Sequence, residues 1–506
     1  MSAIPEVQAQ GDPQTRSGLV GRGLGPWLIA GVIGIFLFAM TLMGWFDVRA
    51  RGVSGPAEVT AILWMNAIAL IAALAYEIRR RPYSLHGMHL IALFLFLGAA
   101  TLFQYSAGRF AVAGSVADLR DEMLPAALSV SIWLVTYLFT YELHQRFSRR
   151  IPLGAVGRFF NRAVPENRTI FLHLLAIATI AYLGIVGLLG ITTRGAAERS
   201  MIDFANETAG YSGFALAFKL LNQYILRGFP LIVMLAGFLI VRRTRGFQQT
   251  LLRALLVLLV AGNLAANNPF AASRMWLVTA LFGVLAPTIF RRARTGWLVV
   301  AISLGGLAIL PALHESRNAL TFGEWESVVT VTSPVRYLAT SADGDHLGMI
   351  SLAVRWVDDN GHTLGRQVLG AVLCWVPRRF WPDKPIGTGA MVTGDLGYGF
   401  TNWSMPIVAE GYVDWGYAGV AAMAALFAFV LSRGDRTYWV GRRPGASDAM
   451  RVIDVLYPFW LGCIIYFTRG DLIAAASHTS PFVLWALALG VGARGMPAQA
   501  EPPAKG

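Results

Sequence analysis

A basic, proline-rich stretch at residues 376–385 carries the densest set of side chains that could do chemistry. Its three prolines restrict the backbone, and its aromatic residues can stack on sugar rings or lie at the level of lipid headgroups. The cations Arg378, Arg379 and Lys384 can together face a diphosphate. The alternative, an interfacial anchor of Trp381 and one arginine, explains neither the prolines nor the aspartate between them. The spacing therefore predicts a rigid basic turn.

Two further arginines occupy tight turns. Arg274 ends the stretch 268–274, which joins two apolar segments with almost no loop. At a helix start, free N–H groups would help Arg274 to hold an anionic headgroup; the alternative is a polar plug that anchors the hairpin. Arg469 either contacts a ligand or pairs with Asp471 across its own turn.

The candidate proton acceptors are a carboxylate and an imidazole. Glu410 lies before a predicted span, where it is either a general base or a favourable charge at a helix N-terminus. His314 follows another span, close to Arg317, and either accepts a proton or closes the helix end.

No cofactor or metal ion is expected. His314, His346 and His362 lack the spacing of a metal site. Residues 343–345, Asp-Gly-Asp, match a short pattern used for metal-nucleotide binding, but an Asp-Gly turn explains them better. The sequence has no P-loop pattern, no HExxH pattern and no nucleophile elbow.

The composition predicts which elements position these side chains. Of the 506 residues, 55% are apolar and 14% are charged, whereas a soluble domain needs about a quarter charged. Two cysteines cannot form a disulfide framework, and the apolar content excludes collagen-like and disordered classes. We therefore expect an all-α polytopic membrane protein. Its net charge of +13 belongs to loops beside the membrane, and no nucleic-acid partner is expected.

Stretches of about 20 apolar residues predict twelve transmembrane helices within a bundle at 25–492. They lie near 25–46, 59–76, 88–106, 123–141, 169–190, 224–241, 254–267, 275–290, 296–313, 416–431, 452–467 and 472–492. The tails 1–24 and 493–506 are predicted to be cytoplasmic, and the first is expected to be disordered because it lacks a signal-peptide pattern.

Charge predicts the orientation. Loops on one side of the spans carry 21 arginines, against 10 Lys and Arg in the short loops of the other side. Since cytoplasmic loops are enriched in Lys and Arg, both termini are predicted to be cytoplasmic. Residues 314–415 then form a large periplasmic loop between the ninth and tenth helices. Within it, 347–357 and 367–376 are apolar but too short to span, so we expect them to lie along the interface or to cover the bundle.

A family resemblance rests on motifs from about the seventh span to the twelfth. They are Asn268-Pro269 with Arg274, Arg317, Gly365-Arg366, Pro377-Arg378, the run Trp381-Pro382-Asp383-Lys384-Pro385, Ser404 with Pro406, Glu410-Gly411-Tyr412, Gly416 with Gly419, and Arg469-Gly470-Asp471. In this order they resemble the O-antigen and exopolysaccharide repeat-unit polymerases of the Wzy type. The first half of the chain matches that family only in being helical and apolar.

The resemblance implies an architecture similar to C-type glycosyltransferases, in the bacterial inner membrane. It implies metal-free transfer of a growing glycan from undecaprenyl diphosphate to a lipid-linked repeat unit at the periplasmic face. Glu410 would be the base, with His314 in reserve. The residues expected to bind diphosphate or glycan are Arg274, Arg317, Arg366, Arg378, Arg379, Lys384, Trp381 and Arg469. A flippase and a chain-length regulator of the same pathway are the implied protein partners.

Two alternatives stay open. An O-antigen ligase shares the architecture and donor; residues 381–385 favour the polymerase, whereas an outer-loop histidine over the site would favour the ligase. A polysaccharide or lipid-linked sugar transporter needs polar residues along a path through the midplane. Asn263, Asn267, Gln223 and His478 are too few and too close to helix ends for such a path.

Overall fold

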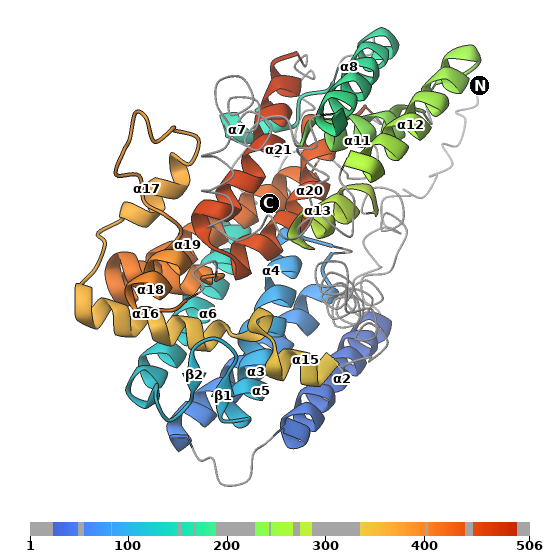
Figure 1. Cartoon of the computed structure of the whole chain (residues 1–506). Helices are drawn as coiled ribbons and strands as arrows, with labels where there is room; N and C mark the ends of the chain where they lie inside the picture. The colour runs from blue at the N-terminus through green and yellow to red at the C-terminus, as the bar shows by residue number, and fades with distance from the viewer. Residues whose placement is uncertain are drawn as a thin grey trace, which may run out of the picture.

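Helices make up most of the part of the chain that the structure describes, as the sequence predicts (Figure 1). This computed structural model describes residues 24–48, 55–81, 83–148, 154–164, 168–188, 228–241, 244–266, 274–285, 334–399, 403–440 and 449–492. One short antiparallel hairpin pairs β1 (Arg109–Phe110) with β2 (Gly114–Ser115). The first half contains α2 (Leu24–Val48), α3 (Ala57–Ile78), α4 (Leu85–Leu93), η2 (Phe94–Ala100), α5 (Thr101–Ser106), α6 (Arg120–Ser148), α7 (Ala155–Phe160), α8 (Arg168–Leu188), α11 (Phe229–Val241) and α12 (Phe247–Ala266). The second half contains α13 (Arg274–Leu285), α15 (Pro334–Thr340), η7 (Ala342–Gly344), α16 (His346–Asn360), α17 (Arg366–Val372), α18 (Thr388–Asp395), α19 (Ile407–Val440), α20 (Val452–Arg469) and α21 (Leu472–Gly492).

Eight helices within the described ranges are long and apolar enough to cross a membrane. These segments are Ala30–Val48, Ala57–Ile78, Leu85–Ser106, Arg120–Phe147, Phe247–Leu264, Ile407–Trp439, Val452–Arg469 and Leu472–Val491. Each overlaps a predicted span. Three more predicted spans coincide with α8, α11 and α13. The apolar part of α8 is short, and α11 and α13 are short helices as a whole. The span predicted at 296–313 lies outside the described residues. The chain is therefore a multi-pass, all-α membrane protein.

The bundle has two ends, and the described parts of three arginine-rich segments, at 79–81, 146–162 and 433–451, share one of them, which we call the arginine end. Arg81, after α3, donates from Nη2 to Oε1 of Gln145 near the end of α6, at 2.9 Å. Arg451, before α20, donates from Nη1 to Oδ1 of Asn161 after α7, at 2.6 Å. These contacts bring together loops that the charge pattern assigned to the same side of the membrane.

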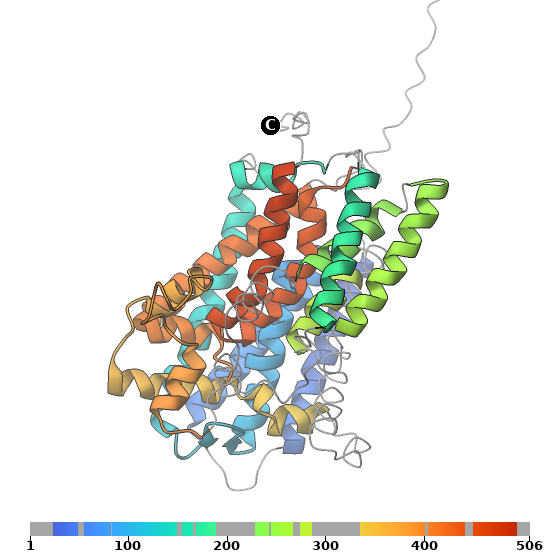
Figure 2. The same cartoon turned by 45° about the horizontal axis from the view of Figure 1, so that its top comes forward.

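The opposite end, the loop end, gathers the described parts of the segments predicted to lie on the other side (Figure 2). Gln104 of α5 donates from Nε2 to the Leu338 carbonyl of α15 at 2.9 Å. Arg355 of α16 donates from Nε to Oε1 of Glu122, in the first turn of α6, at 2.6 Å. The alternation of loops between two ends thus agrees with the predicted order of spans.

The long segment at 334–399 divides into a covering part and a projecting part. Helix α16 lies across the bundle and packs its apolar residues on α6 and α19, so the apolar stretch predicted at 347–357 covers the bundle (Figure 1). The second predicted stretch, 367–376, contains α17. Val372 of α17 is 65% exposed, and nearby Trp375 is 63% exposed. This stretch packs on α21 with one side and leaves apolar side chains uncovered on another.

Helix α19 contains a sharp break close to the predicted start of its span. Trp415 and Gly416 have non-helical backbone angles, and Gly416 has a φ of 61°, which favours glycine. A Cβ atom on Gly419 would lie 2.1 Å from the Gly411 carbonyl oxygen, so the two halves of the helix approach backbone to backbone. The break aims the first half, with Glu410, into the loop end.

Candidate functional site

The basic turn at 376–385 is held in place by cations that donate to backbone carbonyls. Lys384 donates from Nζ to the carbonyl of Cys374 and, at 3.1 Å, to that of Val376. Arg378 donates from Nη1 to the Lys384 carbonyl at 2.7 Å. Arg366, at the start of α17, donates from Nη2 to the Asp383 carbonyl at 2.7 Å. Neutral carbonyl partners leave the positive charges uncompensated, and partial burial lowers the pKa of Lys384.

The same turn exposes a patch that is both basic and apolar. Arg366, Arg378 and Arg379 are exposed, Trp381 is half-buried, and Arg379 makes no hydrogen bond or ion pair with a described residue. The exposed apolar side chains beside them are Leu364, Leu369, Val372, Trp375 and Phe380. We call these residues together the interfacial patch. Apolar side chains flanked by arginines suit a surface that touches acyl chains and phosphate groups at once.

Glu410 lies fully buried behind this patch, with both carboxylate oxygens engaged. Oε1 accepts a hydrogen bond from the backbone N–H of Leu472 at 2.8 Å, and Oε2 accepts one from the hydroxyl of Thr388. These donors belong to the N-termini of α21 and α18. Of the two sequence interpretations, this geometry matches the charge at a helix N-terminus, although the helices are neighbours rather than its own.

Two more carboxylates, of Asp471 and Asp414, are buried and accept hydrogen bonds from backbone N–H groups at helix N-termini. Asp471 accepts from the N–H groups of Gly389 at 3.3 Å and Ile473 at 3.0 Å, and burial raises its pKa. Asp414 accepts from Val368 N–H, in α17, at 3.1 Å. Backbone groups left open at three helix starts are thus satisfied by buried carboxylates, which fixes α17, α18 and α21 against the broken helix.

Arg469 pairs with Asp343 rather than with Asp471, its near neighbour in sequence. Asp343 also accepts a hydrogen bond from the Tyr337 hydroxyl, and the Arg469 guanidinium lies 5.8 Å from the ring centroid of Phe96. The predicted Asp-Gly turn is present, since residues 342–344 form the 3₁₀ helix η7. Its aspartate, however, anchors a buried ion pair that the sequence did not indicate.

Around Phe96 and the adjoining 3₁₀ helix η7 lie several buried polar atoms without a hydrogen-bond partner among the described residues. They are both ring nitrogens of His346, Oε1 of Gln104, Oγ of Ser341 and Nε of Arg469. His346 stacks on Phe96 with ring centroids 4.7 Å apart, and burial lowers its pKa to about 3. Its neighbour Asp345 accepts from Val112 N–H at 2.5 Å and Ala113 N–H at 3.0 Å, while burial raises its pKa to about 6.

This Phe96 cluster was missed in the sequence because no local pattern marks it. Phe96 lies in η2, a π-helical stretch, but in the sequence this stretch is an ordinary part of an apolar run. Such widened turns occur often at functional sites. The turn between α20 and α21 links the cluster to the carboxylates behind the interfacial patch, through Arg469 on one side and Asp471 on the other.

The remaining predicted residues are Arg274, of which the structure describes only the backbone, and His314 and Arg317. Arg274 is the first residue of α13, which packs antiparallel to α20 with Thr279 beside Gly462 and Gly283 beside Phe459, so Arg274 lies toward the loop end. Its side chain lies outside the described part. His314 and Arg317 also lie outside the described residues. Within the described ranges, no three His, Cys, Asp or Glu side chains come together as metal ligands would.

Comparison with known proteins adds no assignment. No family model, curated protein or solved structure matches this chain.

Proposed function

We propose that this chain is a membrane glycosyltransferase that polymerises oligosaccharide repeat units carried on undecaprenyl diphosphate. The observation that carries the proposal is the interfacial patch, in which Arg366, Arg378 and Arg379 are exposed beside Trp375 and Phe380. A polyprenyl diphosphate has the matching composition, with an apolar chain joined to two phosphates. Guanidinium groups bind phosphate oxygens in pairs and stabilise a departing diphosphate.

The rigidity of the turn supports the same role. Transition-state stabilisation by charges requires groups that are already in place, because reorganising them costs free energy during the reaction. Arg378 and Lys384 are tied to backbone carbonyls, and Arg366 is tied to the carbonyl of Asp383. Arg379 has no such tie to a described residue and is the freest of these cations to meet a ligand.

Glu410 has a positioning role in this proposal. As a general base it would have to meet the sugar hydroxyl, but its side chain is fully buried and both oxygens already accept hydrogen bonds from Leu472 N–H and the Thr388 hydroxyl. The proton of the attacking sugar hydroxyl is therefore better assigned to His314, the second candidate base that the family resemblance implies. Glu410 then serves catalysis by holding α18 and α21 in register with α19.

The proposed reaction takes place at the loop end, facing the periplasm of a bacterium. The arginine end is assigned to the cytoplasm because 21 arginines lie in the loops predicted on that side. The protein would then be a multi-pass component of the inner membrane. A flippase that delivers repeat units and a regulator of chain length remain the partners implied by the reaction.

A transporter is less well supported by the polar side chains inside the bundle. His86 shares a hydrogen bond of 2.9 Å with the Tyr137 hydroxyl, and His89 shares one of 2.8 Å with the Thr468 hydroxyl. Trp133 donates from Nε1 to Nε2 of His89 at 3.3 Å. Groups that satisfy one another in this way stabilise a packed bundle rather than line a path for a substrate.

The deciding experiment is the profile of lipid-linked glycans in a strain that lacks this protein. Accumulation of single repeat units on the carrier supports a polymerase, whereas full-length chains retained on the carrier support a ligase and overturn the proposal. Purified protein supplied with one lipid-linked repeat unit should produce a ladder of longer products, in the presence and absence of EDTA. A protein that yields no ladder, in a strain whose profile is unchanged, is not the polymerase.

A further inference from the structure

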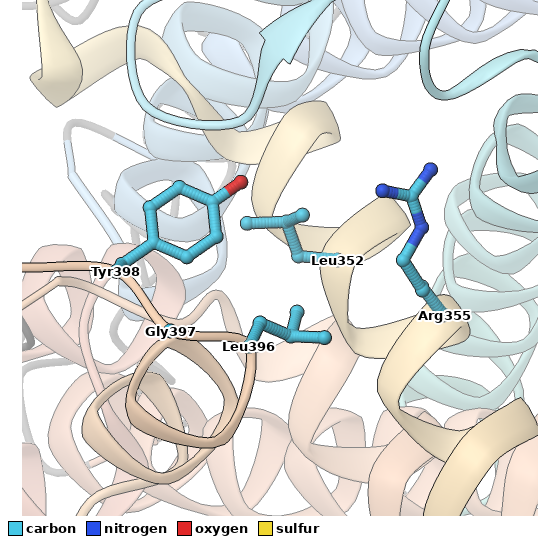
Figure 3. A pocket seen from close by; sticks show the side chains of 5 residues that line it. All are labelled: Leu352, Arg355, Leu396, Gly397 and Tyr398. Atoms are coloured by element: carbon cyan, nitrogen blue, oxygen red, sulfur yellow. The ribbon is translucent and has the colours of Figure 1, made fainter.

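A second candidate binding site lies on the loop end, apart from the interfacial patch. It is a pocket of about 330 Å³, lined by Leu352 and Arg355 of α16 and by Leu396, Gly397 and Tyr398 after α18 (Figure 3). The volume falls at the lower end of the range typical of small-ligand sites, about 300 to 1,000 Å³. It is therefore large enough for one small ring and its immediate substituents.

Two polar groups face the pocket from opposite walls. Figure 3 shows the Tyr398 hydroxyl and the Arg355 guanidinium both directed toward the space between them. The guanidinium is held in place, because Arg355 donates from Nε to Glu122 at 2.6 Å and from Nη2 to the Asp118 carbonyl at 2.5 Å. Glu122 also balances its charge. The pocket therefore offers hydrogen bonds without a net charge to attract an anion.

The rest of the lining is apolar or open. Leu352 and Leu396 supply apolar surface, and Gly397 leaves space, since a Cβ atom there would meet nothing within 4 Å. The φ of 78° at Gly397 favours glycine, which makes this opening a consequence of the turn itself. An apolar surface beside an aromatic ring suits the C–H face of a pyranose, while hydroxyls at the ring edge suit the two polar groups.

Both walls are fixed to the same framework. Trp356 of α16 donates from Nε1 to Oδ2 of Asp395, at the end of α18, at 2.9 Å. Tyr398 N–H donates to the Thr393 carbonyl at 2.9 Å, which closes the turn after α18. A preformed site loses little conformational entropy when a ligand binds.

We infer that this pocket binds one neutral sugar residue of a glycan, outside the reacting centre. This inference rests on the proposed function, which supplies the glycan. It assigns the pocket to a sugar residue rather than to a phosphate. Holding the chain at a point away from the reacting bond would keep a growing product attached between transfers. Loss of the pocket should then shorten the products more than it slows the first transfer.

Direct binding tests the pocket independently of polymerisation. Purified full-length protein in nanodiscs is titrated with the repeat-unit oligosaccharide released from its lipid, with saturation-transfer NMR as the readout. Tyr398→Ala should weaken binding about tenfold or more, and Tyr398→Phe, which removes one hydrogen bond, about threefold to tenfold. Tyr417→Ala is the matched control, because Tyr417 is a partly exposed tyrosine of α19 outside the pocket.

The outcomes separate this inference from the proposed function. Equal affinity of wild type, Tyr398→Ala and Tyr417→Ala, or no binding by wild type, overturns the inference whatever the polymerase assay gives. Selective loss with Tyr398→Ala supports it even if the enzyme proves to be a ligase. In the polymerase assay, Tyr398→Ala should give shorter chains at an unchanged rate of first transfer, and a uniform product length across all variants would exclude a role in holding the chain.

Discussion

Arg81 at the arginine end and Arg378 at the loop end use the same side chain in opposite ways. At the arginine end, Arg81 lies 3.3 Å from Asp435, and this carboxylate also accepts from the hydroxyls of Tyr141 and Tyr457 at 2.7 and 2.5 Å. At the loop end, Arg378 binds only carbonyl oxygens, and it is exposed. A guanidinium surrounded by acidic and phenolic partners has no capacity left for a ligand, whereas one tied to neutral carbonyls keeps its charge available.

Buried polar atoms are also satisfied differently around Asp435 and in the Phe96 cluster. Asp435 is fully buried, and its carboxylate also accepts hydrogen bonds from the N–H groups of Leu85 and His86 at the start of α4. The Phe96 cluster at the loop end leaves both ring nitrogens of His346 unpaired. Saturated networks stabilise a single packing, while unpaired polar groups cost stability and are retained where they have another use. We therefore expect the network around Asp435 to clamp the arginine end, while the proposed function assigns the reaction to the loop end.

The largest effect is expected from Asp435→Asn, because the clamp would lose its charge while Arg81 stays buried beside it. Breaking a buried ion pair on one side costs about 3 to 5 kcal/mol. The thermal midpoint of purified protein in detergent should fall sharply, together with the yield. Asp383→Asn, in the exposed basic turn, is the control and should change stability by less than about 0.5 kcal/mol. Equal stability of the two variants would mean that the arginine end is no clamp.

The next effect is a pair of opposite pH dependences in the Phe96 cluster. The pKa of Asp345 is raised to about 6, so its contribution to stability is present below about pH 4 and is lost as the pH rises to about 6. The pKa of His346 is lowered to about 3, so its contribution is present above about pH 6.5 and is lost as the pH falls. Asp345→Asn should therefore gain stability over wild type above pH 6, by on the order of 3 kcal/mol. His346→Gln should gain stability over wild type as the pH falls below 6.

Thermal unfolding of wild type and both variants between pH 4 and 7 measures these dependences. Comparing each variant with wild type at every pH removes the contributions of all other titrating groups. If the curves of stability against pH run parallel for the three proteins, burial does not shift the pKa of Asp345 or His346 in the way described.

A smaller effect separates ligand binding from anchoring at the interfacial patch. Lysine cannot reproduce the paired hydrogen bonds of arginine, so Arg378→Lys and Arg379→Lys should each lower turnover on the order of tenfold. Arg379→Lys is the cleaner test, because Arg379 has no partner among the described residues. Arg245→Lys, exposed before α12, is the control and should keep the wild-type rate. If both patch variants also keep that rate, the arginines serve only to hold the protein at the membrane surface.

The smallest effect is expected from the cysteines, which belong neither to the network around Asp435 nor to the proposed ligand-binding surface. Cys374 and Cys463 are free and buried, and burial raises the pKa of the Cys374 thiol, which disfavours the reactive thiolate. Replacing both by alanine should leave the rate and length of polymerisation unchanged at matched protein levels. A loss of turnover in the Cys374→Ala variant would place the thiol in the chemistry of the neighbouring turn.

The sequence alone determined the class of the protein and the order of its spans. Apolar runs and arginine-rich loops are local, additive signals, and lipid allows few structures other than helices to satisfy the backbone. The same kind of signal predicted the rigid basic turn, since proline spacing and neighbouring charges act within a few residues. It also predicted a helix start at Gly416, where α19 breaks.

Only the tertiary structure decided which polar groups meet. Arg469 had an acidic neighbour two residues away in sequence, yet it pairs with Asp343, 126 residues away. Glu410, a candidate base by sequence, has its two oxygens occupied by Leu472 N–H and the Thr388 hydroxyl. Each outcome depends on how helices distant in sequence pack, because a buried polar group takes the partner that packing brings within hydrogen-bonding distance.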